Sequence, residues 1–278
     1  MTPPVCSLYV PGDRPERFGK AAASGADIVI LDLEDAVGAD RKDVARENVC
    51  AHLAERRSGP ELHVRINDPA TERGRADLAA LAELPGLDAV RVPKIHGVRD
   101  LAVVDEAFGD RPTPVQALLE SARGLTDAAA ICAHPRVAGV GLGEQDLAAE
   151  LSITDQRAFD HLRLRLVLAA AAAGLPPVAM SVHADVHDEA GLRASCAHGR
   201  SLGMFGRSAI HPRQVPTIRA AFRPTPEEIA RAGEVVAAAE QHGGEGALAL
   251  PDGRFVDAPI IAKARSTLAL ADRLAERG

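Results

Sequence analysis

The chain has 278 residues and a formal net charge of −7, and only 3% of its residues are aromatic. That length fits either two average domains or one α/β barrel of about 250 residues. Because no basic stripe is visible and few rings are available to stack on bases, the composition argues against a nucleic-acid partner. The core must be built from aliphatic side chains, which favours parallel strands that are buried on both faces.

The cysteines and the apolar runs indicate the compartment. No two cysteines have zinc-ligand spacing, and a chain of this size needs no disulfide framework. We therefore expect four reduced and mostly buried thiols, at Cys6, Cys50, Cys132 and Cys196. The N-terminus lacks a basic segment followed by an apolar one, and the alanine-rich run at 166–173 is too short to span a bilayer. These features predict a soluble cytoplasmic protein without a membrane partner.

Short β-rich runs alternate with helical patterns along most of the chain. Eight strands are expected, in residues 5–10, 27–32, 62–67, 89–93, 115–120, 138–142, 178–182 and 204–210. A helical segment follows each, in residues 15–24, 41–57, 74–84, 98–108, 122–133, 146–151 with 156–173, 188–202 and 212–222. Eight such units predict a (β/α)8 TIM-type barrel in residues 1–222. A doubly wound open sheet is the alternative, but no glycine fingerprint for a dinucleotide follows the first strand.

Residues 223–278 are surplus to a barrel and predict a C-terminal extension. A helix is expected over 225–242, because Thr225-Pro226-Glu227-Glu228 reads as an N-cap with acids in the first turn. A glycine-rich loop at 243–246 and a hairpin-like stretch at 247–256 lead to a last helix over 259–276. Such an extension either covers the mouth of the barrel or contacts another subunit.

Charged residues gather where the expected strands end. Asp32, Glu34 and Asp35 follow the second strand, Arg65 lies in the third, Lys94 follows the fourth, Glu120 ends the fifth, and Glu144 and Asp146 follow the sixth. Strand C-ends form the active mouth of such a barrel, so an excess of acids with one arginine and one lysine suits a metal and an anionic substrate. Any single acid here is more often a helix cap or an ion-pair partner than a ligand. Carboxylates without paired histidines favour Mg²⁺ over Zn²⁺.

At these residues the chain resembles the citrate lyase β-subunit-like proteins of the HpcH/HpaI aldolase superfamily. The similarity covers nearly the whole chain. The stretches that carry it are Tyr9 to Phe18, Ile30 to Val37, Val64 to Asn67, Val92 to Lys94, Leu119 to Gly124, Gly143 to Leu147, Ala209 to Pro212 and Val256 to Pro259. They are specific for the family and much less specific for a substrate.

The resemblance implies a (β/α)8 homotrimer that binds Mg²⁺ and a CoA thioester and makes or breaks a C–C bond to a 2-oxo acid. On matching positions, Glu120 and Asp146 would hold Mg²⁺, and Glu120 would also face the substrate. Arg65 would clamp the substrate carboxylate, as a bidentate guanidinium can. Glu34 and Asp35 would bind the metal's waters.

Three further residues receive roles from the resemblance. Asp257 matches an aspartate that enters the site from a neighbouring subunit as acid or base, although it also suits an N-cap before Pro259. Arg14 and Lys42 are candidates for contacts to CoA phosphates. The stretch Met180-Ser181-Val182 lacks an acid that many relatives carry, which leaves the substrate open.

The leading hypothesis is a Mg²⁺-dependent lyase that acts on a 3-hydroxyacyl-CoA thioester of the malyl-, citramalyl- or citryl-CoA kind, in either direction. One alternative is a malyl-CoA-type thioesterase, because a site that forms an enolate can also admit water. Another is an aldolase that uses no CoA, although such enzymes place a histidine base near the mouth. A last alternative is a lyase subunit or scaffold that works with an acyl carrier protein partner.

Overall fold

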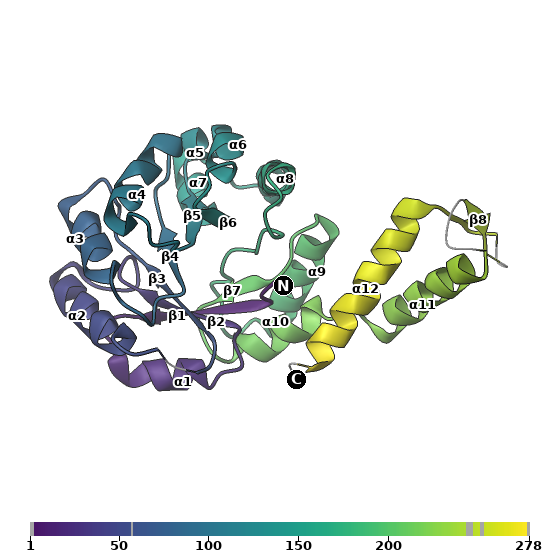
Figure 1. Cartoon of the computed structure of the whole chain (residues 1–278), viewed down its shortest axis with the longest axis horizontal. Helices are drawn as coiled ribbons and strands as arrows, with labels where there is room; N and C mark the ends of the chain where they lie inside the picture. The colour runs from purple at the N-terminus through teal and green to yellow at the C-terminus, as the bar shows by residue number, and fades with distance from the viewer. Residues whose placement is uncertain (1–2, 57, 243–246, 251–252, 277–278) are drawn as a thin grey trace. The chain divides into compact units, whose positions relative to one another are not determined.

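Parallel strands and helices alternate through the larger of two units in this computed structural model (Figure 1). The structure describes residues 3–56, 58–242, 247–250 and 253–276. One unit spans Pro3–Ala221, and the other begins at Phe222 and contains the C-terminal residues. No helix in these described ranges is both long enough and apolar enough to cross a membrane.

A seven-stranded parallel sheet lies at the centre of the larger unit, in the order β6-β5-β4-β3-β2-β1-β7. Its strands are β1 Cys6–Pro11, β2 Ile28–Asp32, β3 Glu61–Arg65, β4 Ala89–Val92, β5 Val115–Leu119, β6 Val137–Leu142 and β7 Arg207–Ala209. All five residues of β2 are buried, as expected for a strand with both faces covered. The parallel α/β class predicted from the aliphatic runs is therefore confirmed.

The strand expected over 178–182 is reduced to two single-residue bridges. Ala179 pairs with Gly141 of β6, and Met180 pairs with Arg207 of β7, both in parallel. Pro176 and Pro177 come just before and have no N–H to donate to a ladder, so the pairing does not extend further toward the N-terminus. The prediction of a full seventh strand was wrong, although these residues lie between the two edge strands of the sheet.

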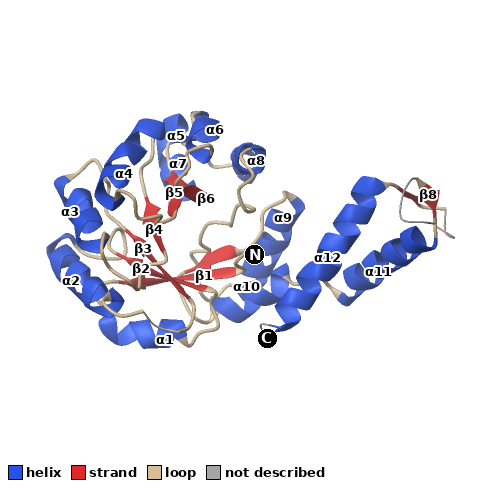
Figure 2. Ribbon diagram, viewed as in Figure 1, coloured by secondary structure: helices blue, strands red, loops and turns tan. Residues whose placement is uncertain are grey.

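Helices surround the strands of this unit (Figure 2). They are α1 Phe18–Ala22, α2 Lys42–Leu53, α3 Glu72–Leu81, α4 Ala102–Phe108, α5 Ala122–Thr126, α6 Ala128–Cys132, α7 Glu144–Leu151, α8 Gln156–Ala172, α9 Glu189–Ser201 and α10 Gln214–Phe222, with short 3-10 turns at Pro15–Arg17, Ala39–Arg41 and Val98–Leu101. The helix expected over 122–133 is two helices, because Asp127 between them leaves the helical conformation. The four cysteines are unpaired, as predicted, and three of them are buried.

The smaller unit is built on two helices, α11 Pro226–Gln241 and α12 Ala258–Glu276. Thr225 and Glu228 form the capping box that starts α11, at the position that the sequence indicated. Between the helices, β8 Leu248–Ala249 pairs antiparallel with β9 Phe255–Val256. The predicted glycine-rich loop at 243–246 lies outside the described residues. The buried residues of this unit form a core of their own, made of Ala232, Val235, Ala239, Leu250, Val256, Ile261 and Ala264.

Candidate active site

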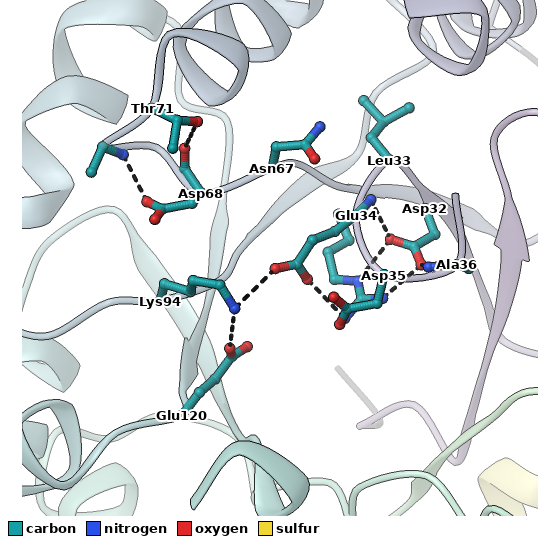
Figure 3. Close-up of polar contacts among 12 residues, drawn as sticks. Asp32, Leu33, Glu34, Asp35, Ala36, Asn67, Asp68, Thr71, Lys94 and Glu120 are labelled. Carbon is teal, nitrogen blue, oxygen red and sulfur yellow. Dashed lines mark hydrogen bonds and ion pairs between the residues drawn. The ribbon is translucent and has the colours of Figure 1, made fainter. Parts of the chain in front are cut away.

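Charged side chains meet where β2, β3, β4 and β5 end (Figure 3). Because the strands are parallel, their carboxyl ends lie at one edge of the sheet. Asp32 of β2 is in register with Arg65 of β3, so the two side chains are neighbours from the start. Glu34, Lys94 and Glu120 follow their strands within two residues. The strand ends therefore place this cluster at one mouth.

Arg65 is held by acids on most of its donors. Its Nε donates to Asp32 Oδ1 at 2.7 Å and its Nη2 to Asp32 Oδ2 at 2.6 Å, a bidentate pair. Nη1 donates to Asp35 Oδ2 at 3.1 Å and lies 3.0 Å from Glu34 Oε2. The guanidinium also lies 4.9 Å from the centre of the Tyr9 ring. The fork that the sequence analysis assigned to a substrate carboxylate thus already binds Asp32.

Asp32 is the residue that organises this side of the site. It is fully buried, and its carboxylate also accepts hydrogen bonds from the backbone N–H groups of Glu34 at 2.9 Å and Ala36 at 3.1 Å. Every oxygen of Asp32 therefore has partners, and the loop after β2 is fixed by them. Sequence reasoning noted Asp32 at the strand end but gave it no role, because its pairing depends on the register between β2 and β3.

Lys94 joins the two sides of the site. Its Nζ lies 3.3 Å from Glu34 Oε1 and 3.5 Å from Glu120 Oε2, so one ammonium links both acids (Figure 3). Its backbone has φ of 55°, a left-handed conformation that costs a non-glycine residue about 1–3 kcal/mol. Burial works against the charge of Lys94, but Glu34 and Glu120 together raise its pKa. The strained backbone aims the ammonium at these acids.

The negative charge of the buried Glu120 is only weakly compensated by nearby cations. It is 9% exposed, and burial raises the pKa of its carboxyl from 4.5 to about 7, with a further contribution from Glu34. Lys94 opposes this shift only from 3.5 Å, and the nearby Asp146 adds to it. A buried carboxylate in this state gains from any additional cation.

Two glycines of β6, and Gly143 directly after it, make room for the side chains of Gln116, Leu118 and Glu120. Gly139 is in register with Gln116 and Gly141 with Leu118. A Cβ at Gly143 would lie 2.5 Å from Glu120 Cγ, one at Gly141 would lie 3.0 Å from Leu118 Cδ2, and one at Gly139 would lie 2.3 Å from Gln116 Oε1. The side chains of Gln116 and Leu118 therefore pack against the glycine backbone of β6, and Gly143 sets the position of Glu120.

Asp146 stands in the first turn of α7, shortly after Gly143. It is exposed, and within the described ranges no hydrogen bond or ion pair holds its carboxylate. Glu144, two residues before it, is bound by Arg163 in a bidentate pair at 2.8 and 2.7 Å. Arg163 of α8, which sequence reasoning missed, also donates to Asp160 at 2.9 Å. The neighbouring acid is thus tied down, and Asp146 is left for a ligand.

A cavity of about 510 Å³ connects these groups. Its lining includes Arg65, Glu120 and Asp146. Among the described residues there is no group of three or more His, Cys, Asp or Glu side chains that would form a complete protein cage for a metal. Mg²⁺ needs no such cage, because it keeps several waters and takes one or two protein carboxylates. Two hard oxygen donors, one of them buried with an elevated pKa, fit that ion.

Two further predicted site residues, Lys42 and Arg14, make local contacts outside the cavity lining. Lys42 donates its Nζ to the backbone carbonyls of Leu33 at 2.9 Å and Glu34 at 2.7 Å, so it supports the loop after β2. Arg14 is exposed and lies 3.8 Å from Asp13. Neither lines the cavity. These contacts give both side chains local tasks that the sequence did not reveal.

Asp257 belongs to the smaller unit. It directly precedes α12, and its Oδ1 accepts a hydrogen bond from the N–H of Ile260 at 3.2 Å. This is the helix-cap geometry that the sequence analysis kept as the alternative for this residue.

The fold and the site together define an α/β enzyme with an acid-lined mouth at its strand ends. The model of the HpcH/HpaI aldolase/citrate lyase family matches residues 6–212. The chain therefore belongs to this family.

Individual relatives are similar over almost their full length. A (3S)-malyl-CoA thioesterase of Cereibacter sphaeroides is 40% identical over 96% of this chain and 94% of its own. An L-malyl-CoA/beta-methylmalyl-CoA lyase of the same species is 34% identical over 94% of this chain and 92% of its own. The crystal structure of protein CitE from Mycobacterium tuberculosis, in complex with magnesium, acetoacetate and coenzyme A, has a TM-score of 0.81 at 36% identity and covers 96% of this chain and 98% of its own. The predicted resemblance is confirmed.

Proposed function

We propose that this protein is a Mg²⁺-dependent C–C lyase that acts on a 3-hydroxyacyl-CoA thioester of the malyl-, citramalyl- or citryl-CoA kind. The products are an acyl-CoA and a 2-oxo acid, and the same site can run the condensation. The observation that carries the proposal is the buried Glu120, with its pKa raised to about 7, beside the uncommitted Asp146 in the cavity. Relatives named for malyl-CoA chemistry supply the substrate class.

In this proposal Glu120 and Asp146 hold the magnesium ion. Bound there, Mg²⁺ supplies Lewis-acid stabilisation of the negative charge that develops on a substrate oxygen. Both oxygens of Glu34 lie within ion-pair distance of a cation, at 3.0 Å from Arg65 and 3.3 Å from Lys94, but neither has hydrogen-bond geometry. Glu34 is therefore able to accept a hydrogen bond from a water in the site, and Asp35 is proposed for the same task.

Arg65 is proposed to bind and orient the substrate with the N–H groups that do not donate to Asp32 or Asp35. Nη2 carries two hydrogens and donates one of them to Asp32. The bidentate pair with Asp32 fixes the direction of the second N–H bond of Nη2. The substrate is thus expected to meet one oriented N–H rather than the full fork.

We propose Asp257 of a second copy of the chain as the acid–base group, in a homotrimer. The family resemblance supports this assignment, and in the described part of the chain no histidine lines the cavity to serve as a base. Mixing two inactive variants tests it. If subunits share sites, Glu120→Gln mixed with Asp257→Asn regains part of the activity after subunit exchange. If the mixture stays inactive while native mass spectrometry with one variant isotope-labelled shows mixed trimers, Asp257 does not act across subunits.

We also propose that residues 1–222 form a closed (β/α)8 barrel and that residues 223–278 form an extension that contacts another subunit. The bridges of Ala179 to β6 and of Met180 to β7 support closure, because they link the two edges of the sheet. Phe255 of the extension is 62% exposed, which suits a subunit contact. A cytoplasmic location stays a prediction of the composition.

The second candidate function is a thioesterase acting on malyl-CoA. The 40% identical relative that carries this name favours it. A product assay separates the two: the lyase releases acyl-CoA and a 2-oxo acid, whereas the thioesterase releases free CoA and a hydroxy acid. The full chain is incubated with (3S)-malyl-CoA, and the products are resolved by chromatography. Turnover that persists at full rate in EDTA would overturn both functions.

A further inference from the structure

A second arginine lines the cavity, on the strand next to that of Arg65. Arg91 of β4 is in register with Arg65 of β3 on one side and with Gln116 of β5 on the other. All three line the cavity. Arg65 reaches the acids that follow β2, whereas Arg91 points across the interior and donates its Nη2 to Ser7 Oγ of β1 at 3.3 Å. β1 and β4 are not neighbours in the sheet, so this side chain spans the space between them.

Arg91 differs in its surroundings from three other arginines of this unit, whereas the buried Arg207 likewise donates to neutral groups, those of Ser181, Ser195 and Cys196. Arg65, Arg136 and Arg163 each pair with a carboxylate at 2.8 Å or less. In the described part of the chain no ion pair joins Arg91 to an acid, and its Nε is buried without a hydrogen-bond partner. Its recorded partners are neutral hydroxyl groups, those of Ser7 and Tyr9. A guanidinium taken out of water without a counter-charge is costly.

The cavity has space beside this charge. Interiors of such barrels are usually filled by layers of bulky branched side chains. Arg91 is in register with Gln116 of β5, which is in register with Gly139 of β6. Gly139 has no side chain, and a Cβ there would lie 2.3 Å from Gln116 Oε1. Ser7 and Gly141 also line this part with little bulk. A cation without a carboxylate partner in the described residues therefore lines a mostly apolar cavity, with the hydroxyl of Ser7 and the amide of Gln116 beside it.

We propose that Arg91 forms the centre of an anion site inside the cavity and that its ligand is a small carboxylate. A planar carboxylate matches the free Nε edge of the guanidinium, and the amide of Gln116 and the hydroxyls of Ser7 and Tyr9 are the further donors. This site goes beyond the lyase reaction, and its binding of an anion can be tested independently of that reaction. The carboxylate comes from one of two sources, a free small acid or a second carboxylate of the substrate.

Anion-dependent thermal stability of the full chain tests the site. Melting is measured in EDTA, in anion-poor buffer and with added acetate, for wild type, Arg91→Met and Arg91→Lys. Arg99→Met is the control, because it removes the same charge from an exposed position. Acetate is expected to raise the Tm of wild type and Arg99→Met by several degrees and to leave Arg91→Met unchanged. Arg91→Met in anion-poor buffer is expected to be at least as stable as wild type, because it removes an uncompensated charge.

Three results would overturn the site. The first is a wild type that does not respond to acetate, and the second is an Arg91→Met variant that responds as wild type does. The third is a large loss of stability in Arg91→Met that Arg91→Lys restores in anion-poor buffer, because a positive charge at this position would then be a structural element. Each is read without an activity assay, so a failure of the proposed reaction leaves this test intact.

Calorimetry with two 2-oxo acids identifies the source of the carboxylate. Pyruvate and 2-oxoglutarate are titrated into wild type and Arg91→Met in the presence of Mg²⁺. If the site binds a carboxylate of the substrate, Arg91→Met lowers the affinity for 2-oxoglutarate at least tenfold and leaves the affinity for pyruvate unchanged. If the site serves a free acid, both 2-oxo acids bind the two proteins alike while the acetate response still requires Arg91.

Discussion

The two sides of the candidate site differ in how far their charges are satisfied. On the β2–β3 side, Asp32 and Arg65 form a buried bidentate pair that backbone N–H groups complete. On the β5–β6 side, Glu120 is buried with one long contact to Lys94, and Asp146 stands without a partner in the described residues. On the first side the charges are satisfied, whereas on the second Glu120 has only the distant ammonium of Lys94 and Asp146 has no ion pair in the described residues. Variants on the two sides should therefore fail in different ways, the first in stability and the second in metal-dependent activity.

The largest effect is expected on the unsatisfied side. Glu120→Gln keeps the shape of the side chain but removes the charge that a divalent ion requires. Substitutions of residues that only support a metal ligand already cost about 10–100-fold. Loss of the ligand itself should therefore lower kcat/KM with Mg²⁺ by more than about 100-fold. Glu106→Gln, on the exposed face of α4, is the matched control and should leave activity unchanged. The thermal stability of Glu120→Gln should equal or exceed that of wild type, because a buried charge is lost. Equal activity of the two variants would contradict the assignment of Glu120.

The satisfied side should respond in stability. Asp32→Asn leaves Arg65 buried without its main counter-charge, and breaking one partner of such a pair costs about 3–5 kcal/mol. Urea unfolding of the full chain measures this loss. In the double variant with Arg65→Met much of the loss should be recovered, because the unpaired cation is gone. A double variant as unstable as the sum of the two single changes would show that the pair is not coupled.

Gly143 tests whether the backbone between β6 and α7 sets the position of Glu120. Gly143→Ala puts a methyl group 2.5 Å from Glu120 Cγ, so the carboxylate must move, and Mg²⁺ affinity should fall about 10–100-fold. Gly141→Ala, two residues earlier and within β6, meets only the end of Leu118 at 3.0 Å and should change the affinity much less. Calorimetric titration with Mg²⁺ compares the two. An equal effect of both changes would mean that crowding of β6, rather than the displacement of Glu120, is responsible.

The strands and the acids at their ends were predictable because both are local features. β5 was expected at 115–120 and is found at Val115–Leu119, since a buried parallel strand is a short run of apolar residues. The pairing of Arg65 with Asp32 was not predictable, because it depends on which residues two strands bring into register. The same holds for Lys94, whose left-handed backbone aims it at two acids from different strands. The reduction of the expected strand at 178–182 to two bridges was not predictable, because an apolar run of this length is typical of a buried strand.

The smallest effect concerns pH. With its pKa raised to about 7, Glu120 holds a proton in the folded protein that it has already lost in the unfolded chain above its ordinary 4.5. Its contribution to the free energy of unfolding therefore falls as pH rises from about 4.5 to 7 and is constant above that. Mg²⁺ must displace the same proton, so its affinity should increase about tenfold between pH 6 and 8. Calorimetry in buffers of different ionisation enthalpy should detect close to one released proton per ion at pH 6 and little release at pH 8. Proton release that persists in Glu120→Gln would assign it to another group, and the raised pKa would then play no part in metal binding.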